Sequence, residues 1–398
     1  SAWILDKPSF IQILNDAGAV VAQRRFTYDG AANSSDAPAK GSLTKEEEWL
    51  YPNPSNPANP AGVWLATSLS YDAYGNVASV TDALGRTTTN TYDTTTHAYL
   101  TQITNTLGHS RKLLYDARFG AVISSTDQNG KTTTTEYDVL GRVTKVIGPT
   151  DTTALPTISY EYQLNATPPS RTIVHTRIQS GQAGVVTVSA FTDGLGRTIQ
   201  TRSPAENPLK QVVTGAVEFN SRGLVTKQWV PYLDALSTSY VSHALVPGLA
   251  PPVTYTYDAI GRLIQVTDPD GSKTFTDYND GETIALLANG TQTSKLLDAY
   301  GRLSQVEEVV SDTVFYTTTY TYDTLNNLLQ VKDAKGNLTK ISYDSLGRKL
   351  SMDDPDMGSW TYAYDAVDNL TSQRDARGVV TSFTYDVLNR LTQKSYTV

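Results

Sequence analysis

The chain has 398 residues, a net charge of −8, a sequence pI of about 5.1 and no cysteine. This acidic balance disfavours nucleic acid or an anionic membrane as the main partner, and the lack of cysteine excludes disulfides, thiolate metal sites and a cysteine nucleophile. No apolar run is long enough to cross a bilayer, so the sequence predicts no membrane span. Tyrosine is abundant (24) and phenylalanine scarce (8), which suits sheets with one wet face.

Residues 1–70 form an irregular start. Residues 10–14 (FIQIL) predict a strand, and the turn residues at 15–18 predict a hairpin leading into a second one. Residues 34–62 are rich in Pro, Ala, Asn and Ser, which predicts a surface loop, with a binding loop as the alternative. The chain opens Ser-Ala-Trp, without Met or a charged leader, and we expect it to be a piece of a longer protein.

A repeated hexad, Tyr-Asp-x-x-Gly-(Arg/Asn), organises residues 71–142 and 257–398. Near the end of the chain its tyrosine recurs every 21 residues, and a fixed period of this size is typical of repeat architectures. The residues that define the hexads are Tyr71, Asp72, Gly75, Tyr137, Asp138, Gly141, Arg142, Tyr257, Asp258, Gly261, Arg262, Tyr322, Asp323, Tyr343, Asp344, Gly347, Arg348, Tyr364, Asp365, Tyr385 and Asp386. We predict that these residues build structure and not an active site.

The hexad is a turn formula. Asp at the first turn position accepts hydrogen bonds from the backbone ahead of it, and Gly at the fourth adopts positive φ. Asn326, Asp368 and Asn389 replace that glycine, and Asn and Asp are the other residues that best tolerate positive φ. Residues 268–271 (DPDG) look like the best copy of the turn.

A second, weaker turn signal lies about halfway between hexads, as in TDALGR at 81–86. Turns spaced about ten residues apart predict antiparallel all-β structure. Residues 143–256 carry insertions between repeats, with Pro-containing connections at 167–170 and 246–252. The aromatic cluster at 229–232 favours core packing over a partner contact.

Stacked hairpins bring the hexad arginine of one unit over a ring of the next. Such a cation–π contact is worth about 0.5–2 kcal/mol. We therefore predict that Tyr343→Ala lowers the melting temperature without altering ligand binding.

The hexads, followed by Thr-Asp-x-x-Gly, resemble the YD repeat of the Rhs (rearrangement hotspot) superfamily, which includes teneurins and wall-associated proteins. The order of elements from Asn105 to Arg197 resembles the Rhs part of B components of bacterial toxin complexes. The resemblance implies a spiralling sheet of stacked antiparallel hairpins, part of a hollow shell, formed by one continuous domain over 1–398. It also implies a toxin polypeptide as partner, encoded C-terminally or on an associated chain, other toxin-complex components, and a secreted or cell-surface location. The family's cleavage motif is absent, and we interpret residues 354–358 (DPDMG) as a turn.

Several candidate sites have a structural explanation that we prefer. The four histidines, His97, His109, His175 and His243, lack metal-ligand spacing. Asp353, Asp354 and Asp356 cluster as in a glycosidase, but nearly every Asp belongs to a repeated turn. Calcium loops are incomplete. We therefore expect no catalysis, cofactor or metal. The alternatives are a cell-surface or carbohydrate-binding adhesion module, tested by a glycan array, and a polysaccharide-cleaving enzyme, tested by replacing those three aspartates.

Overall fold

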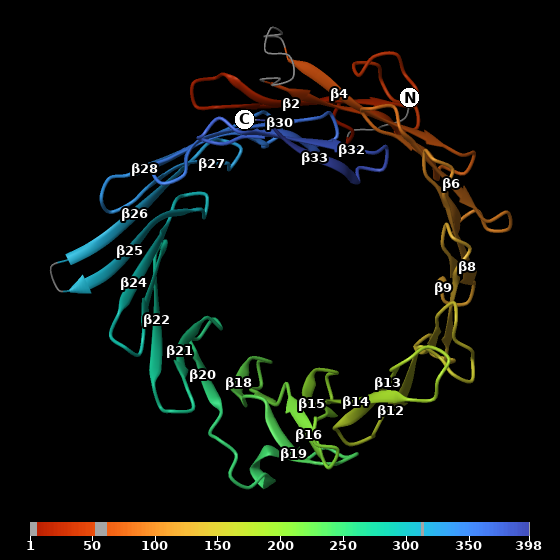
Figure 1. Ribbon diagram of the computed structural model, residues 1–398, viewed down its shortest axis with the longest axis vertical. Helices are drawn as coiled ribbons and strands as arrows, with labels where there is room; N and C mark the ends of the chain where they lie inside the picture. The colour runs from red at the N-terminus through yellow and green to blue at the C-terminus, as the bar shows by residue number, and fades with distance from the viewer. Residues whose placement is uncertain (1–5, 52–61, 312–313, 398) are drawn as a thin grey trace. The chain divides into compact units, whose positions relative to one another are not determined.

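The computed structural model describes residues 6–51, 62–311 and 314–397 (Figure 1). Within these ranges the chain forms antiparallel strands and one 3-10 turn, η1 (His243–Leu245), and no α-helix. The all-β prediction is confirmed. Because Val, Thr and Tyr are frequent in these segments and turn residues punctuate them, strand is the favoured local structure. No helix in this described part is long and apolar enough to cross a bilayer.

Within the described ranges the first sheet has 17 strands. They are β1 (Phe10–Leu14), β2 (Val20–Tyr28), β3 (Leu43–Leu50), β4 (Val63–Tyr71), β5 (Val77–Thr81), β6 (Thr87–Tyr92), β7 (Leu100–Thr104), β8 (Ser110–Asp116), β9 (Ala121–Thr126), β10 (Thr132–Tyr137), β11 (Val143–Ile147), β12 (Ile158–Gln163), β13 (Ser170–Arg177), β14 (Val185–Thr192), β15 (Thr198–Pro204), β16 (Lys210–Thr214) and β19 (Tyr232–Ala235).

The second sheet has 16 strands in the part of the chain that the structure describes. They are β17 (Val217–Phe219), β18 (Val225–Gln228), β20 (Val253–Tyr257), β21 (Leu263–Thr267), β22 (Lys273–Asn279), β23 (Glu282–Leu286), β24 (Gln292–Leu297), β25 (Leu303–Ser311), β26 (Val314–Tyr322), β27 (Leu328–Lys332), β28 (Leu338–Tyr343), β29 (Lys349–Asp354), β30 (Gly358–Tyr364), β31 (Leu370–Arg374), β32 (Val380–Tyr385) and β33 (Leu391–Thr397).

Hairpins stack along the chain, and each hexad closes one of them. The register shifts at the hexad tyrosine, where Tyr71 faces Val77 and Tyr257 faces Leu263. Two residues on one strand oppose one on the other at these points, which is a β-bulge with the turn glycine at positive φ. The turn therefore fixes the register of the pair that follows it.

The chain crosses between the two sheets three times between β16 and β20, from β16 to β17, from β18 to β19 and from β19 to β20. β16 pairs with β19 in the first sheet, whereas the hairpin β17–β18 starts the second and β18 pairs with β20. The two sheets therefore interleave in sequence at residues 210–257.

The chain divides into two compact units. Unit 1 comprises 1–112, 296–307 and 315–398, and unit 2 comprises 113–295 and 308–314. In Figure 1 the N-terminal strands β2 and β4 and the C-terminal strands β30 and β33 of unit 1 are drawn in the same part of the picture, and the backbone of Ser345 hydrogen-bonds that of Tyr51. The interpretation of residues 1–398 as one continuous domain stays a prediction.

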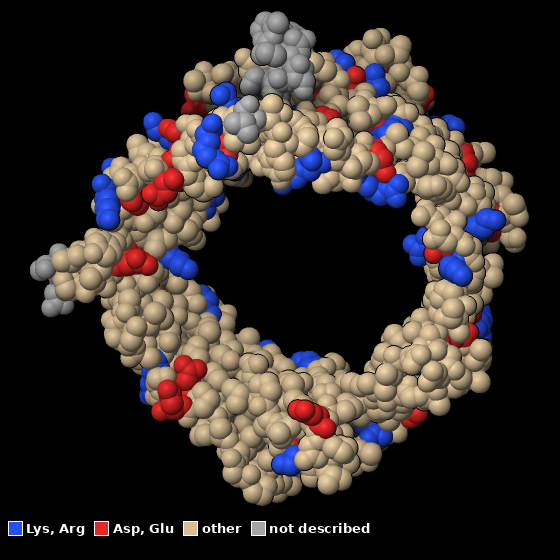
Figure 2. Space-filling view, viewed as in Figure 1, with Lys and Arg blue, Asp and Glu red and all other residues tan. Residues whose placement is uncertain are grey.

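Both faces of the sheets are widely accessible. The accessible surface is 23587 Å², whereas a compact monomer of 43.3 kDa would expose about 15,000 Å². Among the described residues, few apolar side chains are fully buried, for example Leu50, Phe191 and Val213. On the face seen in Figure 2, acidic and basic side chains are scattered among each other and do not gather in a patch of one sign.

The irregular segments follow the predicted pattern in part. The prediction of a loop over 34–62 is wrong for residues 43–50, which form β3, because this stretch pairs with β2 on one side and β4 on the other. Residues 10–14 form β1, and its hairpin turns at 15–18. Of the predicted Pro-rich loop, residues 52–61 lie outside the described residues. The predicted connections at 167–170 and 246–252 lie mainly between strands, and residues 355–357 form the predicted turn between β29 and β30.

Candidate functional site: the stacked repeat turns

The turn that closes each hexad is a compact hydrogen-bonded unit. In the turn at 258–262, Asp258 Oδ1 accepts from the backbone N–H groups of Ile260 (3.0 Å) and Arg262 (2.8 Å). The N–H of Asp258 donates to the carbonyl of Arg262, and that of Gly261 to the carbonyl of Asp258. Gly261 has φ +94°, a conformation that costs glycine nothing sterically.

The same acceptor geometry recurs throughout the repeat. One carboxylate oxygen accepts from the backbone N–H groups two and four residues ahead at Asp72, Asp138, Asp258, Asp323, Asp344, Asp365 and Asp386. The other oxygen accepts from the sixth residue of the hexad, as Asp258 does from the Arg262 guanidinium at 2.7 Å. This Arg262 hydrogen bond and the backbone donors hold the pKa of Asp258 below its usual range.

The apparently best turn copy behaves differently. In residues 268–271 the turn is closed by the same backbone hydrogen bond as in the other copies, with the Gly271 N–H donating to the Asp268 carbonyl. However, the N–H of Ser272 donates to Asp270 Oδ1 at 2.9 Å and not to Asp268. The sequence pattern therefore predicted the turn correctly and assigned the acceptor to the wrong aspartate.

The hexad tyrosine ties its hairpin to the one before. Its hydroxyl donates to a backbone carbonyl near the start of an earlier strand, at 2.7–3.0 Å. The pairs are Tyr71 with Leu43, Tyr137 with Val122, Tyr257 with Val225, Tyr322 with Leu303, and Tyr385 with Leu370. At Tyr343 and Tyr364, burial raises the pKa of the phenol.

An arginine that ends a hexad, or the related turns at 192–197 and 297–302, lies over an aromatic ring of the next unit, as predicted. The guanidinium carbon stands 4.0–5.0 Å from the ring centroid in five such pairs. They are Arg142 with Tyr162, Arg197 with Phe219, Arg262 with Tyr278, Arg302 with Tyr322, and Arg348 with Tyr364. The predicted cation–π stacking between units is confirmed.

Asn and Asp at the glycine position make a bond that the sequence reasoning missed. Arg302 Nη1 donates to the carbonyl of Asp323 (2.9 Å) and to Asn326 Oδ1 (3.0 Å). Arg348 reaches the next turn in the same way, and its bond to Asp368 Oδ1 is 2.9 Å long. Both acceptor residues have φ +67°. The replacements therefore bridge neighbouring turns as well as tolerating positive φ. The signal in the sequence was that each follows a turn ending in Arg: Asn326 follows residues 297–302 (LDAYGR), and Asp368 follows the hexad at 343–348.

In unit 1 two of these turns contact the N-terminal strands. The N–H of Ser345 donates to the carbonyl of Tyr51 (2.7 Å), and the N–H of Tyr51 donates to Ser345 Oγ (2.8 Å). Ser345 Oγ also donates to the carbonyl of Trp49. The adjoining ion pair of Asp344 and Arg348 is largely buried, with side chains 0% and 8% exposed.

A second contact uses the turn-bridging arginine. Arg86, the last residue of TDALGR, donates from Nη1 to the carbonyl of Val387 (3.2 Å) and to Asn389 Oδ1 (2.9 Å). This is the geometry of Arg302 on Asn326, but here the partners lie 303 residues apart in sequence. We call the contact of β2–β5 and their turns with the turns at 344–348, 365–369 and 386–390 the seam.

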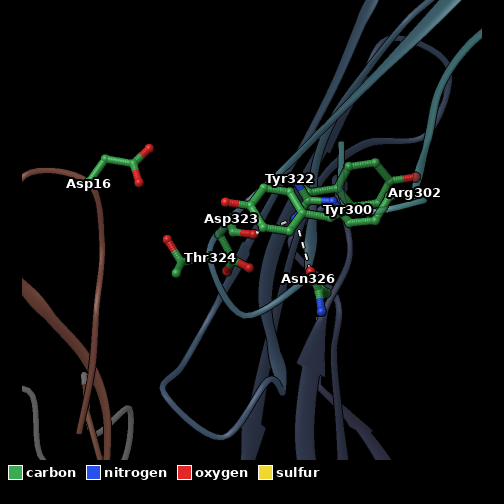
Figure 3. A pocket seen from close by; sticks show the side chains of 7 residues that line it. All are labelled: Asp16, Tyr300, Arg302, Tyr322, Asp323, Thr324 and Asn326. Carbon is green, nitrogen blue, oxygen red and sulfur yellow. Dashed lines mark hydrogen bonds between the residues drawn. The ribbon is translucent and has the colours of Figure 1, made fainter. Parts of the chain in front are cut away.

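Hollows run along the seam and beside it. Cavities of about 410, 440 and 220 Å³ each have walls from both the N-terminal and the C-terminal part of unit 1. A further cavity of about 240 Å³ lies between Asp16, on the β1–β2 turn, and the turns carrying Tyr300, Arg302 and Asn326 (Figure 3). In that view Arg302 is held between the two tyrosine rings and bonds Asn326. Charged side chains line these walls, including Arg24, Glu46 and Glu48 in the first cavity.

In unit 2 a buried polar cluster lies where the chain changes sheets. Arg202 of β15 is fully buried, and its Nη2 donates to Asp234 of β19 at 2.6 Å. Its Nε donates to Gln200, which is also fully buried. Nearby, Trp229 stacks on His243 with ring centroids 3.9 Å apart, and burial lowers the pKa of His243. The aromatic residue Trp229 thus packs within unit 2.

The other candidate residues occupy structural positions. Asp354 accepts from Thr339 and from the backbone of Asp356 and Met357, and Asp353 accepts from Ser359. Within the described ranges no group of three or more His, Asp or Glu is placed to hold a metal ion. The histidines lie apart, for example His97 on Tyr74 and His175 between Thr187 and Glu161.

This geometry defines a class of protein, a scaffold of stacked Tyr-Asp hairpins. The chain belongs to the teneurin YD-shell family, whose profile matches residues 163–395, more than half of its length. The RHS repeat profile matches residues 115–153. A search of curated proteins gave no match.

Solved structures share the fold. A crystal structure of TcdB2-TccC3 matches with a TM-score of 0.80 and 17% identity, covering 95% of this chain and 24% of that one. TcdB2-TccC3-Cdc42 matches at 0.80 and 16%, covering 95% and 26%. A Photorhabdus luminescens Tc holotoxin pore matches at 0.79 and 16%, also covering 95% and 26%. The chain therefore spans about a quarter of the length of the solved chains it matches.

Proposed function

We propose that this chain is a non-enzymatic wall segment of a secreted or cell-surface shell that encloses a toxic polypeptide. The observation that carries the proposal is the match of 95% of the chain to toxin-complex structures at a TM-score of 0.80. The cargo is a polypeptide encoded C-terminally or on an associated chain, and other toxin-complex components are the further partners.

The hairpin chemistry supports a wall. A sheet that is one layer thick needs stability without a thick core, and here the repeated turns supply it. A hexad satisfies its own backbone groups and ties back through its tyrosine, as Tyr257 does, and a hexad that ends in arginine also reaches forward, as Arg348 does. Since each unit contacts its neighbours in this way, the array extends without a central core. Repeated devices of this kind suit a container better than catalysis, which requires one unique arrangement.

A protease-protection experiment tests the proposal. An unfolded, protease-sensitive reporter is fused after Val398, and the same reporter is fused to a compact globular domain as control. Enclosure predicts that the reporter on this chain is cleaved much more slowly than the control. Equal cleavage rates for the two fusions would contradict the enclosing function.

An adhesion module is the second candidate, and exposed aromatic turn tips favour it. Tyr74 and Tyr300 are 64% and 82% exposed, and Tyr74 stacks on His97 with centroids 3.6 Å apart. Exposed rings of this kind suit a carbohydrate ligand. Glycan-array binding that is lost in Tyr74→Ala and Tyr300→Ala would support this candidate. If the parent chain binds no glycan, the wall function is the one candidate that is left.

A further inference from the structure

We propose that the seam of unit 1 is a separable closure, which opens while the hairpin sheets on both sides stay folded. Between the N-terminal strands and the C-terminal turns the described residues show no strand pairing. In the described part of the chain, the direct backbone-linked contacts include those of Ser345 with Trp49 and Tyr51, and of Arg86 with the turn at 386–390. The sheets, in contrast, are held by continuous ladders such as β13 with β14.

Packing along the seam is loose and polar. The three hollows of about 410, 440 and 220 Å³ lie between its two sides and are open to solvent, so the two sides are not closely packed over that area. Leu65, Leu346 and Val367 line the first of them beside Glu46 and Asp368. Opening therefore exposes surfaces that are already polar in part, and it breaks few direct bonds.

Two contacts hold the seam. We call the contact of Ser345 with Trp49 and Tyr51 the Ser345 latch, and that of Arg86 with the turn at 386–390 the Arg86 latch. The Ser345 latch bonds backbone to backbone and anchors the buried pair of Asp344 and Arg348. The Arg86 latch has the same geometry as the turn-to-turn bond between Arg302 and Asn326. Asn389 Oδ1 also accepts from the side chain of Asn369 at 2.7 Å. Local opening at such points requires less free energy than global unfolding. Under the proposed wall function, the seam is the route through which the enclosed space becomes accessible.

The test uses a Ser345→Ala/Asn389→Gly variant, because glycine keeps the positive φ of Asn389 and removes only its acceptor. Since the chain has no cysteine, Asp16→Cys and Thr324→Cys place one spin label on each side of the 240 Å³ cavity. The matched control is Ser342→Ala, whose hydroxyl pairs with Ser351 inside the hairpin β28–β29.

The spin-label distances of the parent chain are expected to be narrow. In the double variant we expect a second, longer population and faster hydrogen exchange of β3 and residues 344–348, with β30 and β31 still protected. The control is expected to match the parent. Two results would overturn the proposal. One is unchanged spin-label distances and hydrogen-exchange rates in the double variant, and the other is a hydrogen-exchange rate that increases equally in all strands. Both measurements need no cargo, so they are independent of the protease-protection result.

Discussion

At the scale of single residues, the hexad assigns a separate bond to each of its members. Aspartate holds the turn, tyrosine reaches back, arginine reaches forward, and glycine or Asn supplies positive φ. The repeated side chains of the hexad therefore bond to neighbours within the array. Substitutions at different hexad positions should therefore have different and separable costs.

The tyrosine hydroxyl can be tested alone. Tyr257→Phe keeps the ring and removes the 2.7 Å bond to the carbonyl of Val225. We expect the free energy of unfolding to fall by about 1 kcal/mol, measured by chemical denaturation. Tyr300→Phe is the control, because Tyr300 is 82% exposed, and its stability should be nearly unchanged. Equal effects in the two variants would contradict the assigned role.

The bridging residue makes a sharper test. Asn326→Gly improves the fit to φ +67° but removes the acceptor for Arg302. We expect a net loss of about 0.5–1 kcal/mol, since a hydrogen bond to a charged group outweighs the small conformational gain. A more stable variant in thermal melting would show that Asn326 serves only its backbone conformation.

At the scale of elements, each loop and hairpin depends on a few polar anchors. The loop before β3 is organised by Asp29, whose carboxylate accepts from the N–H groups of Ala39, Lys40, Gly41 and Ser42. These bonds, led by that from Gly41, lower the pKa of Asp29 to about 2.

This pKa gives the loop a defined acid response. The folded-state pKa lies below the ordinary value of 3.8, so the stabilisation is complete above about pH 4 and is lost as pH falls towards 2. We expect the protection of the amides of residues 39–42, taken relative to the intrinsic exchange rate at each pH, to fall over that range. In Asp29→Asn the same amides should exchange faster at neutral pH and respond less to acid. Equal acid responses in parent and variant would contradict the role of Asp29.

The buried ion pair between β15 and β19 predicts an asymmetry. Arg202 has no exposed side-chain surface, whereas Asp234 is 18% exposed. Asp234→Ala leaves a buried guanidinium without its charge partner, and we expect a loss of about 3–5 kcal/mol. Arg202→Met should cost less, because Asp234 can reach water. Denaturant titration of both variants checks this, and an equal or reversed order would contradict it.

At the scale of the whole molecule, exposed sheet edges are the features that most favour association with other chains. In the described residues β1 pairs only with β2, and its apolar side chains Phe10, Ile11, Ile13 and Leu14 are 39–48% exposed. Apolar edge strands pair readily with other chains.

We therefore expect concentration-dependent association of the purified chain, measured by sedimentation velocity. Ile11→Lys/Ile13→Lys places two charges on one face of the edge strand and should reduce that association. A monodisperse monomer at all concentrations would show that this edge does not self-associate.

The sequence by itself determined the hairpins, because each turn is encoded within six neighbouring residues. The Asp acceptor, the positive-φ Gly or Asn and the strand-forming residues between them act locally, and the arginine–ring contacts follow from stacking the units in order. The acceptor switch from Asp268 to Asp270 shows the limit of the pattern even at this range.

Only the tertiary structure decided which distant turns meet. Nothing in TDALGR marks Arg86 as the partner of Asn389, since the same arginine chemistry elsewhere serves the next turn along the chain. The contacts of Ser345 with Trp49 and Tyr51, and the burial of Arg202, likewise depend on how folded strands are placed. Local residues fix a turn through short-range bonds, whereas long-range pairing is set by the accumulated geometry of many repeats.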